Sequence, residues 1–221
     1  TSTSAVCVTG LVVQDTGSYW SLFGQTVILV LIQTGGLGVV TVASSVVMLA
    51  GRKISLMQRS TMQDAISAPK VGGIVRLTRF ILKGTFLIEF LGALMLMPVF
   101  CRDFGLKGIW MSVFHSISAF CNAGFHILGT SEHRFVSLTG YAGNIWLNIV
   151  IMLLIIIGGI GFLTWEDVYT NKLNFKRYRM QSKVILITTM VLIFLPAVFF
   201  MACDFDYMPA GKRILASVFQ S

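Results

Sequence analysis

Residues 116–125 read SISAFCNAGF, a small, polar, glycine-containing stretch that lies between two strongly apolar regions. Residues 2–10 read STSAVCVTG, and the two stretches share the pattern SxSAxCxxG. A short polar element that occurs twice in an apolar chain indicates an internal structural repeat. The glycine that closes each copy, Gly10 or Gly124, predicts a backbone conformation that other residues adopt only at a cost.

The composition around these elements is that of a membrane protein. The 221 residues are 55% hydrophobic and only 12% charged, about half the charged fraction of a typical soluble domain. A helix crosses the hydrocarbon core with roughly 20 residues, and four apolar stretches reach that length. The sequence therefore predicts an all-α integral membrane protein with four full spanning helices. These stretches are the uncharged residues 16–51, 135–165 and 184–203, and residues 80–100, which contain only Lys83 and Glu89.

The basic residues are distributed as membrane topology requires. The net charge is +8, and most of the 17 Lys and Arg residues lie in 52–83 and 172–183, the alternate connections between the apolar stretches. Basic residues mark the cytoplasmic side of a membrane protein. Contact with the lipid bilayer therefore explains the charge without nucleic acid, and both SxSAxCxxG elements are expected toward the outer side.

Two further pairs of similar motifs support the internal repeat. GGLGVVT at 35–41 matches GGIGFLT at 158–164, and SVFHS at 112–116 matches SVFQS at 217–221. Each unit is thus an outward helix, a short helix, a glycine loop and an inward helix, and all units share one orientation. The chain is expected to be a fragment that begins and ends within such units. The predicted parts are 1–50 (end of repeat 1), 51–77 (cytoplasmic linker), 78–165 (repeat 2), 166–183 (cytoplasmic linker) and 184–221 (start of repeat 3).

Repeat 2 predicts a re-entrant loop. A spanning helix is expected over 78–100, and the apolar-faced stretch 109–120 is too short to span. Asn122 and Gly124 interrupt it before a polar loop, and 142–164 is predicted as the next full span. Irregular backbone at membrane depth persists only where it lines water or is buried in protein.

Such a segment can coordinate a cation. Carbonyls of several extended segments around one axis can replace the hydration shell of an ion. The short helices before Gly10 and Gly124 would aim their negative C-terminal ends at that axis. Neither element contains a carboxylate, so neutral oxygens and a partly dehydrated monovalent ion are expected. A plain packing loop is the alternative, and the repetition favours the pore.

Other polar residues have simpler interpretations. Glu89 predicts a polar contact that holds its helix to the short helix at 109–120, although an ionisable residue at membrane depth can also be functional. Lys83 is expected to extend toward the interface, and His115, matched by Gln220, predicts a neutral hydrogen bond. His126 and His133 are expected to be solvated. The glycine clusters predict close helix packing or bending, and the four cysteines show no metal or disulfide spacing.

These elements resemble the Trk/Ktr family of potassium-translocating membrane subunits. The resemblance rests on SxSAFCNAGF with GGIGFLT, QTGGLGVVT at 33–41, RKISL at 52–56 and GGIVRLTRFIL at 72–82, and it covers essentially the whole chain. It implies M1–pore helix–M2 units around a pseudo-fourfold pore in the cell membrane. It also implies one filter segment per unit, here Cys7-Val8-Thr9-Gly10 and Cys121-Asn122-Ala123-Gly124, with potassium as the transported ion.

The resemblance implies partners as well. It predicts a homodimer and a cytosolic nucleotide-binding regulatory subunit, which would hold ATP, ADP or NAD while this chain binds no cofactor. Gly10, where related sodium-transporting members often have serine, favours potassium over sodium. A secondary transporter of another small cation or solute, or a non-transporting scaffold, are the alternatives. No nucleophile–base arrangement or metal cluster points to an enzyme.

Overall fold

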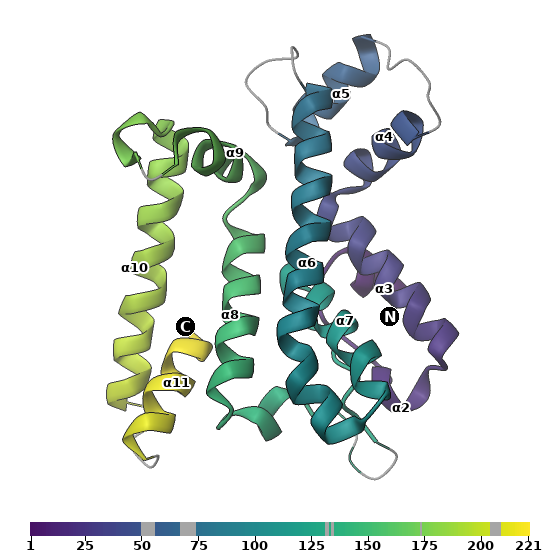
Figure 1. Cartoon of the computed structure of the whole chain (residues 1–221), viewed down its shortest axis with the longest axis vertical. Helices are drawn as coiled ribbons and strands as arrows, with labels where there is room; N and C mark the ends of the chain where they lie inside the picture. The colour runs from purple at the N-terminus through teal and green to yellow at the C-terminus, as the bar shows by residue number, and fades with distance from the viewer. Residues whose placement is uncertain (50–55, 67–73, 131–132, 134, 173, 204–208) are drawn as a thin grey trace.

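The computed structural model describes residues 1–49, 56–66, 74–130, 133, 135–172, 174–203 and 209–221. Every regular element in these residues is helical, as Figure 1 shows. Much of the linker predicted at 51–77, including Arg52, Lys53 and Lys70, lies outside the described residues. The elements are α1 (Ser2–Val6), α2 (Thr16–Tyr19), α3 (Leu22–Leu37), α4 (Val39–Leu49), α5 (Leu56–Ile66), α6 (Ile74–Phe104), α7 (Lys107–Phe120), η1 (Leu138–Tyr141), α8 (Ile145–Gly159), α9 (Phe162–Asn171), η2 (Phe175–Arg177), α10 (Met180–Cys203) and α11 (Ala210–Gln220).

Repeat 2 has the predicted order of a spanning helix followed by a short helix. α6 contains 31 residues, about 46 Å of helix, and exceeds the predicted 78–100 at both ends. The chain then reverses, and α7 packs back along α6 (Figure 1). Gly108 makes this reversal possible, since a Cβ atom there would lie 2.4 Å from the Phe100 carbonyl. α7 spans 14 residues and confirms the short, non-spanning helix.

The prediction of four full spanning helices is wrong in one respect. Within the described residues, two helices, in α6 and α10, have membrane length, and a third span exists only if α8 and α9 are counted together despite a 97° bend. α3 is a shorter apolar helix of 16 residues, about 24 Å long. The stretch predicted as one span at 142–164 therefore breaks after α8, because Gly161 adopts a φ of +84°. Gly38, with a φ of +83°, separates α3 from α4 in the same way.

One apolar core joins repeats 1 and 2. It contains buried side chains of α3, α6, α7 and α8, including Ile32, Leu96, Phe114 and Leu147. The α10 helix of repeat 3 lies at the side of this core (Figure 1). Only 6% of its most apolar 18-residue stretch is buried inside the structure. Its exposed Leu, Val and Phe side chains form a surface suited to lipid or to another protein segment in the membrane.

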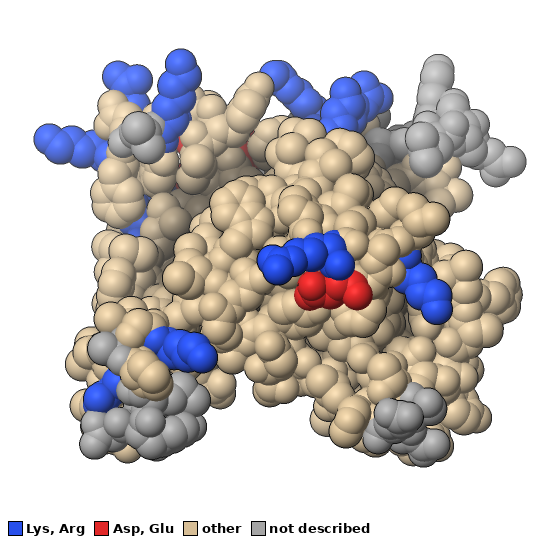
Figure 2. All heavy atoms as spheres, turned by 60° about the horizontal axis from the view of Figure 1, so that its bottom comes forward, with Lys and Arg blue, Asp and Glu red and all other residues tan. Residues whose placement is uncertain are grey.

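The two ends of the molecule differ in charge. α5, α9 and the start of α10 lie at one end, and α2, the α6–α7 reversal and the loops after the glycine elements lie at the other (Figure 1). Figure 2 shows Lys and Arg side chains along the rim that belongs to the first end. The exposed basic residues of this end include Arg76, Arg79, Lys172, Lys176, Arg177 and Arg179.

Candidate ion-binding site

The two glycine elements have the same backbone course. α1 ends at Val6 and α7 at Phe120, and the first residue after each helix, Cys7 or Cys121, keeps a right-handed helical conformation. The closing glycines have left-handed φ values, +73° for Gly10 and +70° for Gly124. This confirms that the glycines occupy a conformation that penalises other residues. Residues 7–10 and 121–124 were predicted as filter segments from the sequence, and for brevity they are called the first and second filter segments below.

A second left-handed residue precedes each glycine. Val8 has a φ of +55° and Asn122 a φ of +56°, a conformation that is strained for a β-branched residue such as valine. Sequence comparison of the two segments did not reveal this position, because valine and asparagine share little chemically. In both segments one residue, Thr9 or Ala123, separates the two left-handed positions.

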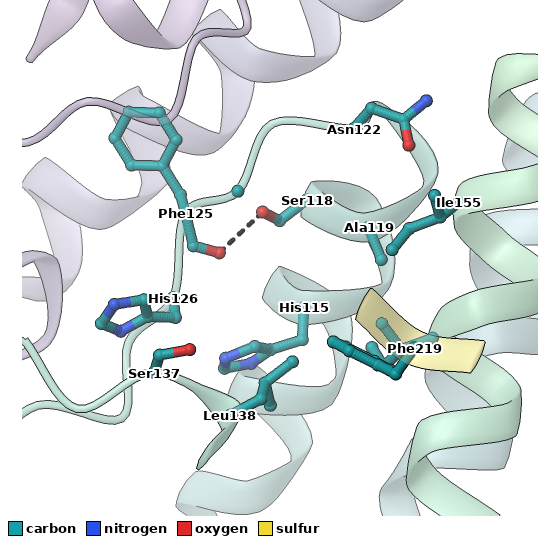
Figure 3. Close-up of a pocket in the computed structure, with 12 residues that line it drawn as sticks. His115, Ser118, Ala119, Asn122, Phe125, His126, Ser137, Leu138, Ile155 and Phe219 are labelled. Carbon is teal, nitrogen blue, oxygen red and sulfur yellow. Dashed lines mark hydrogen bonds between the residues drawn. The ribbon is translucent and has the colours of Figure 1, made fainter. Parts of the chain in front are cut away.

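The second serine of each SxSAxCxxG motif fastens its filter segment to the short helix. The Ser4 carbonyl accepts from the Thr9 backbone N–H at 3.0 Å, and the Ser118 carbonyl accepts from Ala123 at 2.8 Å. The Ser118 hydroxyl also donates to the Phe125 carbonyl at 2.6 Å (Figure 3). Sequence reasoning assigned no role to these serines, although their repetition in the motif was the available signal.

The two filter segments approach each other at their glycines. A Cβ atom on Gly10 would lie 2.8 Å from the Ala123 carbonyl oxygen and 3.5 Å from the Gly124 Cα. A Cβ atom on Gly124 would lie 3.6 Å from the Gly10 Cα, an ordinary contact. The structure thus brings together two segments separated by more than a hundred residues, and only Gly10 is required by space as well as by φ.

The GGxG clusters hold the short helices in place. A Cβ atom on Gly35 would lie 2.0 Å from the Val6 carbonyl, and one on Gly158 would lie 1.9 Å from the Phe120 carbonyl. The first glycine of each cluster therefore lets the following helix touch the last residue of its own pore helix. Gly36 lies against Cys121 of the next repeat, because a Cβ atom on Gly36 would lie 2.4 Å from the Cys121 Sγ. The predicted close packing is confirmed, and the third glycine of each cluster provides the bend described above.

Asp15 joins the loops that follow the two filter segments. Its carboxylate accepts from the Ser18 N–H and hydroxyl, both at 2.8 Å, and from the Phe135 N–H at 3.0 Å. The side chain is 1% exposed, and Gly129 packs directly against it. Burial raises the pKa of Asp15, but the hydrogen bonds from Ser18 and Phe135 outweigh it and hold the pKa below its ordinary value. An aspartate three residues before Ser18 at a helix start was the sequence signal for this cap.

We expect Asp15→Asn to destabilise the protein by about 1–3 kcal/mol at pH 7, because a buried set of donors loses its ionised acceptor. The pKa of Asp15 is lower in the folded protein than in the unfolded chain, where it is about 3.9. The contribution of ionised Asp15 to the free energy of unfolding is therefore complete above the unfolded pKa and is lost as pH falls through the folded pKa. Melting temperatures of the full-length protein in detergent at pH 7 and at about pH 3.5 should therefore differ less in the variant than in the wild type. Asp103→Asn is the control, since Asp103 is exposed and accepts from Tyr141 alone. An equal acid sensitivity of wild type and Asp15→Asn would contradict the assignment.

The remaining predicted residues have mixed outcomes. His115 is buried, and its Nδ1 donates to the Met111 carbonyl at 2.7 Å, as a neutral hydrogen-bonding role requires. His133 and Lys83 are exposed, as expected. The expectation that His126 is solvated is wrong: it is half-buried, and it faces a cavity together with His115 (Figure 3). Burial lowers the pKa of His126, against the opposing effect of Asp15.

Glu89 is buried, as a helix-to-helix contact requires, but its side chain has a different partner from the one expected. The carboxylate accepts from the Gln33 side chain of α3 at 2.8 Å. The contact with the pore helix is made instead by the Glu89 backbone carbonyl, which accepts from the Ser116 hydroxyl at 2.7 Å. All four cysteines are free. Small packing residues were expected at both Cys7 and Cys121; Cys121 is buried as expected, but Cys7 is exposed. No group of three or more potential metal ligands occurs among the described His, Cys, Asp and Glu residues.

Comparison with known proteins identifies the family. The family described as "TrkH: Cation transport protein" matches residues 1–221. The chain belongs to the TrkH family. The potassium/sodium uptake protein NtpJ of Enterococcus hirae is 40% identical over 194 residues, which are 87% of this chain and 42% of that protein. The Ktr system potassium uptake protein B of Bacillus subtilis is 41% identical over 193 residues, with 87% of this chain and 42% of that protein covered.

A third relative extends over the whole chain. The Ktr system potassium uptake protein B of Vibrio alginolyticus is 31% identical over 229 residues, which cover 100% of this chain and 49% of that protein. This TrkH-family chain thus spans about half the length of the curated relatives it matches. Membership confirms the resemblance to the Trk/Ktr family that the sequence motifs indicated.

Proposed function

We propose that this chain forms part of the ion pathway of a potassium-uptake protein, with the cation held by backbone carbonyls of residues 7–10 and 121–124. The observation that carries the proposal is the pairing of two filter segments with the same left-handed positions, whose glycines are in contact. Neither segment contains an acidic side chain. Neutral carbonyls at the C-terminal ends of α1 and α7 suit a monovalent cation.

A cavity beside the second filter segment supports further filter segments around the same axis. It has a volume of about 270 Å³ and lies between α7, α8 and α11 (Figure 3). At the equivalent place between repeats 1 and 2, the space is filled by the second filter segment and Phe125. The repeat pattern relates Ala119, Ile151 and Ile155 of the cavity to Ala5, Ile28 and Ile32, which share one buried cluster with Cys121, Ala123 and Phe125.

We therefore infer that the cavity receives the filter segment of a third repeat in the longer protein. With the relatives about twice the length of this chain, four such repeats would surround one pore with pseudo-fourfold symmetry. Phe219 of α11, the counterpart of Phe114, already lines the cavity as the pore helix of that third repeat would.

The basic end of the molecule is the proposed cytoplasmic face. Figure 2 shows Lys and Arg side chains along its upper rim, which belongs to this end, and others on the end that faces the viewer. The assignment of the rim to the cytoplasm follows the positive-inside rule. Three relatives are named as components of a Ktr system. We propose that this face meets a cytosolic nucleotide-binding subunit that holds ATP, ADP or NAD, and that the intact protein is a homodimer.

The test is cation uptake by the full-length protein in cells that lack their own potassium uptake. We expect growth at limiting potassium and rubidium uptake that sodium competes with weakly, and we expect Gly124→Ser to reduce the preference for potassium. Uptake of sodium as well as potassium would match the wider range in the name of NtpJ. Uptake of a neutral solute would favour a secondary transporter, and no transport by a correctly inserted protein would favour a scaffold.

A further inference from the structure

A buried glutamate–glutamine pair joins repeats 1 and 2 within the membrane region. Glu89 lies in α6 and is 4% exposed. The Gln33 side chain of α3 donates to its carboxylate with an Nε2-to-Oε1 distance of 2.8 Å. Gln33 itself is half-buried, and hydrogen bonds between side chains of neighbouring helices contribute to helix association in a membrane.

The same residue of α6 also anchors the second pore helix. The Ser116 hydroxyl, fully buried in α7, donates to the Glu89 backbone carbonyl at 2.7 Å. Gly92, one turn further along α6, makes room for this contact, because a Cβ atom there would lie 2.5 Å from the Ser116 Oγ. Glu89 therefore connects α3 of repeat 1, through its side chain, to α7 of repeat 2, through its backbone.

Gln33 lies two residues before Gly35 and three before Gly36, which contact the ends of α1 and α7 at the two filter segments. Gly35 packs on the Val6 carbonyl, just before the first filter segment, and Gly36 packs on Cys121, the first residue of the second. A hydrogen bond that fixes Gln33 relative to Glu89 thus fixes where α3 meets both segments. Loss of the bond would release α3 from α6 at the level where the spacing of the segments is set.

The equivalent positions of the later repeats do not contain this pair. In the second GGxG motif the position of Gln33 is occupied by Ile156, and α10 carries no charged residue after Lys183. Apolar contacts between the helices of neighbouring repeats are therefore compatible with this fold. The buried polar pair between repeats 1 and 2 is an additional feature. Buried hydrogen-bonded pairs fix one geometry among several that apolar packing allows.

We propose that Glu89 and Gln33 are positioning residues that hold the two filter segments at the spacing needed to prefer potassium over sodium. The inference rests on the proposed function, because it assigns these residues a part in cation discrimination at the same site. The role belongs to the hydrogen bond, in which the carboxyl oxygen is the acceptor, and an acceptor of similar shape can fulfil it.

The experiment compares four variants of the full-length protein: Glu89→Leu, Gln33→Ile, the double variant, and Glu89→Gln. Rubidium uptake with and without competing sodium gives the ion preference, together with the half-saturating concentration and the maximal rate. We expect the two single variants that lack the bond to lose fivefold or more of the preference for potassium over sodium. The double variant should lose no more than either single variant, and Glu89→Gln should remain within twofold of the wild type.

Thr26→Val is the matched control, since the hydroxyl of this exposed α3 residue donates to the Leu22 carbonyl of its own helix, and the variant should leave the ion preference unchanged. If Glu89→Gln lost as much of the preference for potassium over sodium as Glu89→Leu, the inference would be overturned in favour of a role for the charge of Glu89. An unaltered preference in Gln33→Ile would overturn it as well, and this variant decides alone if Glu89→Leu does not reach the membrane. A wild-type protein without cation uptake would instead refute the proposed function.

Discussion

Replacing Gly10 with alanine is expected to abolish most of the preference for potassium over sodium. The new Cβ would lie 2.8 Å from the Ala123 carbonyl oxygen, so one filter segment must move away from the other. The φ of +73° adds a penalty of about 1–2 kcal/mol for any residue with a side chain. A loss of about 1.4 kcal/mol in discrimination corresponds to a tenfold change in ion preference. We expect at least that change, measured as rubidium uptake under sodium competition.

Gly124→Ala is the matched comparison. It carries the same φ penalty, but its Cβ would meet only the Gly10 Cα, at 3.6 Å. The effect on ion preference should therefore be distinctly smaller than that of Gly10→Ala. Equal effects would mean that φ alone determines the requirement for glycine, and a larger effect at Gly124 would contradict the contact geometry of the two segments.

Gly158→Ala is expected to have the largest effect on stability. Its Cβ would lie 1.9 Å from the Phe120 carbonyl oxygen, and neither partner is a flexible side chain. Inserting one methyl group into a packed interior costs about 1–3 kcal/mol, and a clash between two backbones places this variant at or above the upper end. We expect a lower melting temperature in detergent and reduced uptake, because the end of α7 that leads into the second filter segment is displaced.

Gly211→Ala provides the control for this prediction. Gly211 lies in α11, is exposed, and has open space around its Cα. Alanine is a better helix former than glycine by about 1 kcal/mol, so this variant should be neutral or slightly stabilising. A melting temperature of Gly158→Ala equal to that of Gly211→Ala would show that α8 does not press on the pore helix.

Local pattern was sufficient to predict much of this protein. The apolar stretches, the short helix that ends at Phe120 and the special backbone of Gly10 and Gly124 were all predicted from residue types and their repetition. They were predictable because hydrophobic length, charge placement and glycine conformation are local properties of the chain. The GGxG clusters were recognised as packing or bending sites for the same reason.

The breaks and the contacts between repeats were not predictable in this way. An uncharged stretch such as 142–164 has no local signal that distinguishes one straight span from a helix bent by 97° at Gly161. The partner of Glu89 was assigned to its own pore helix, whereas the structure places Gln33 beside it from another repeat. Asp15 was not considered, because its importance depends on Phe135, far away in the sequence.

By itself, then, the sequence determined a membrane protein built from repeated units, each with a glycine loop after a short helix. Only the tertiary structure decided three contacts: Gly10 with Gly124, Gly158 with the Phe120 backbone, and the hydrogen bond between Gln33 of repeat 1 and Glu89 of repeat 2. The reason is physical: propensity and hydrophobicity act along the chain, whereas the distance between two segments is set by the side chains that fill the space between them.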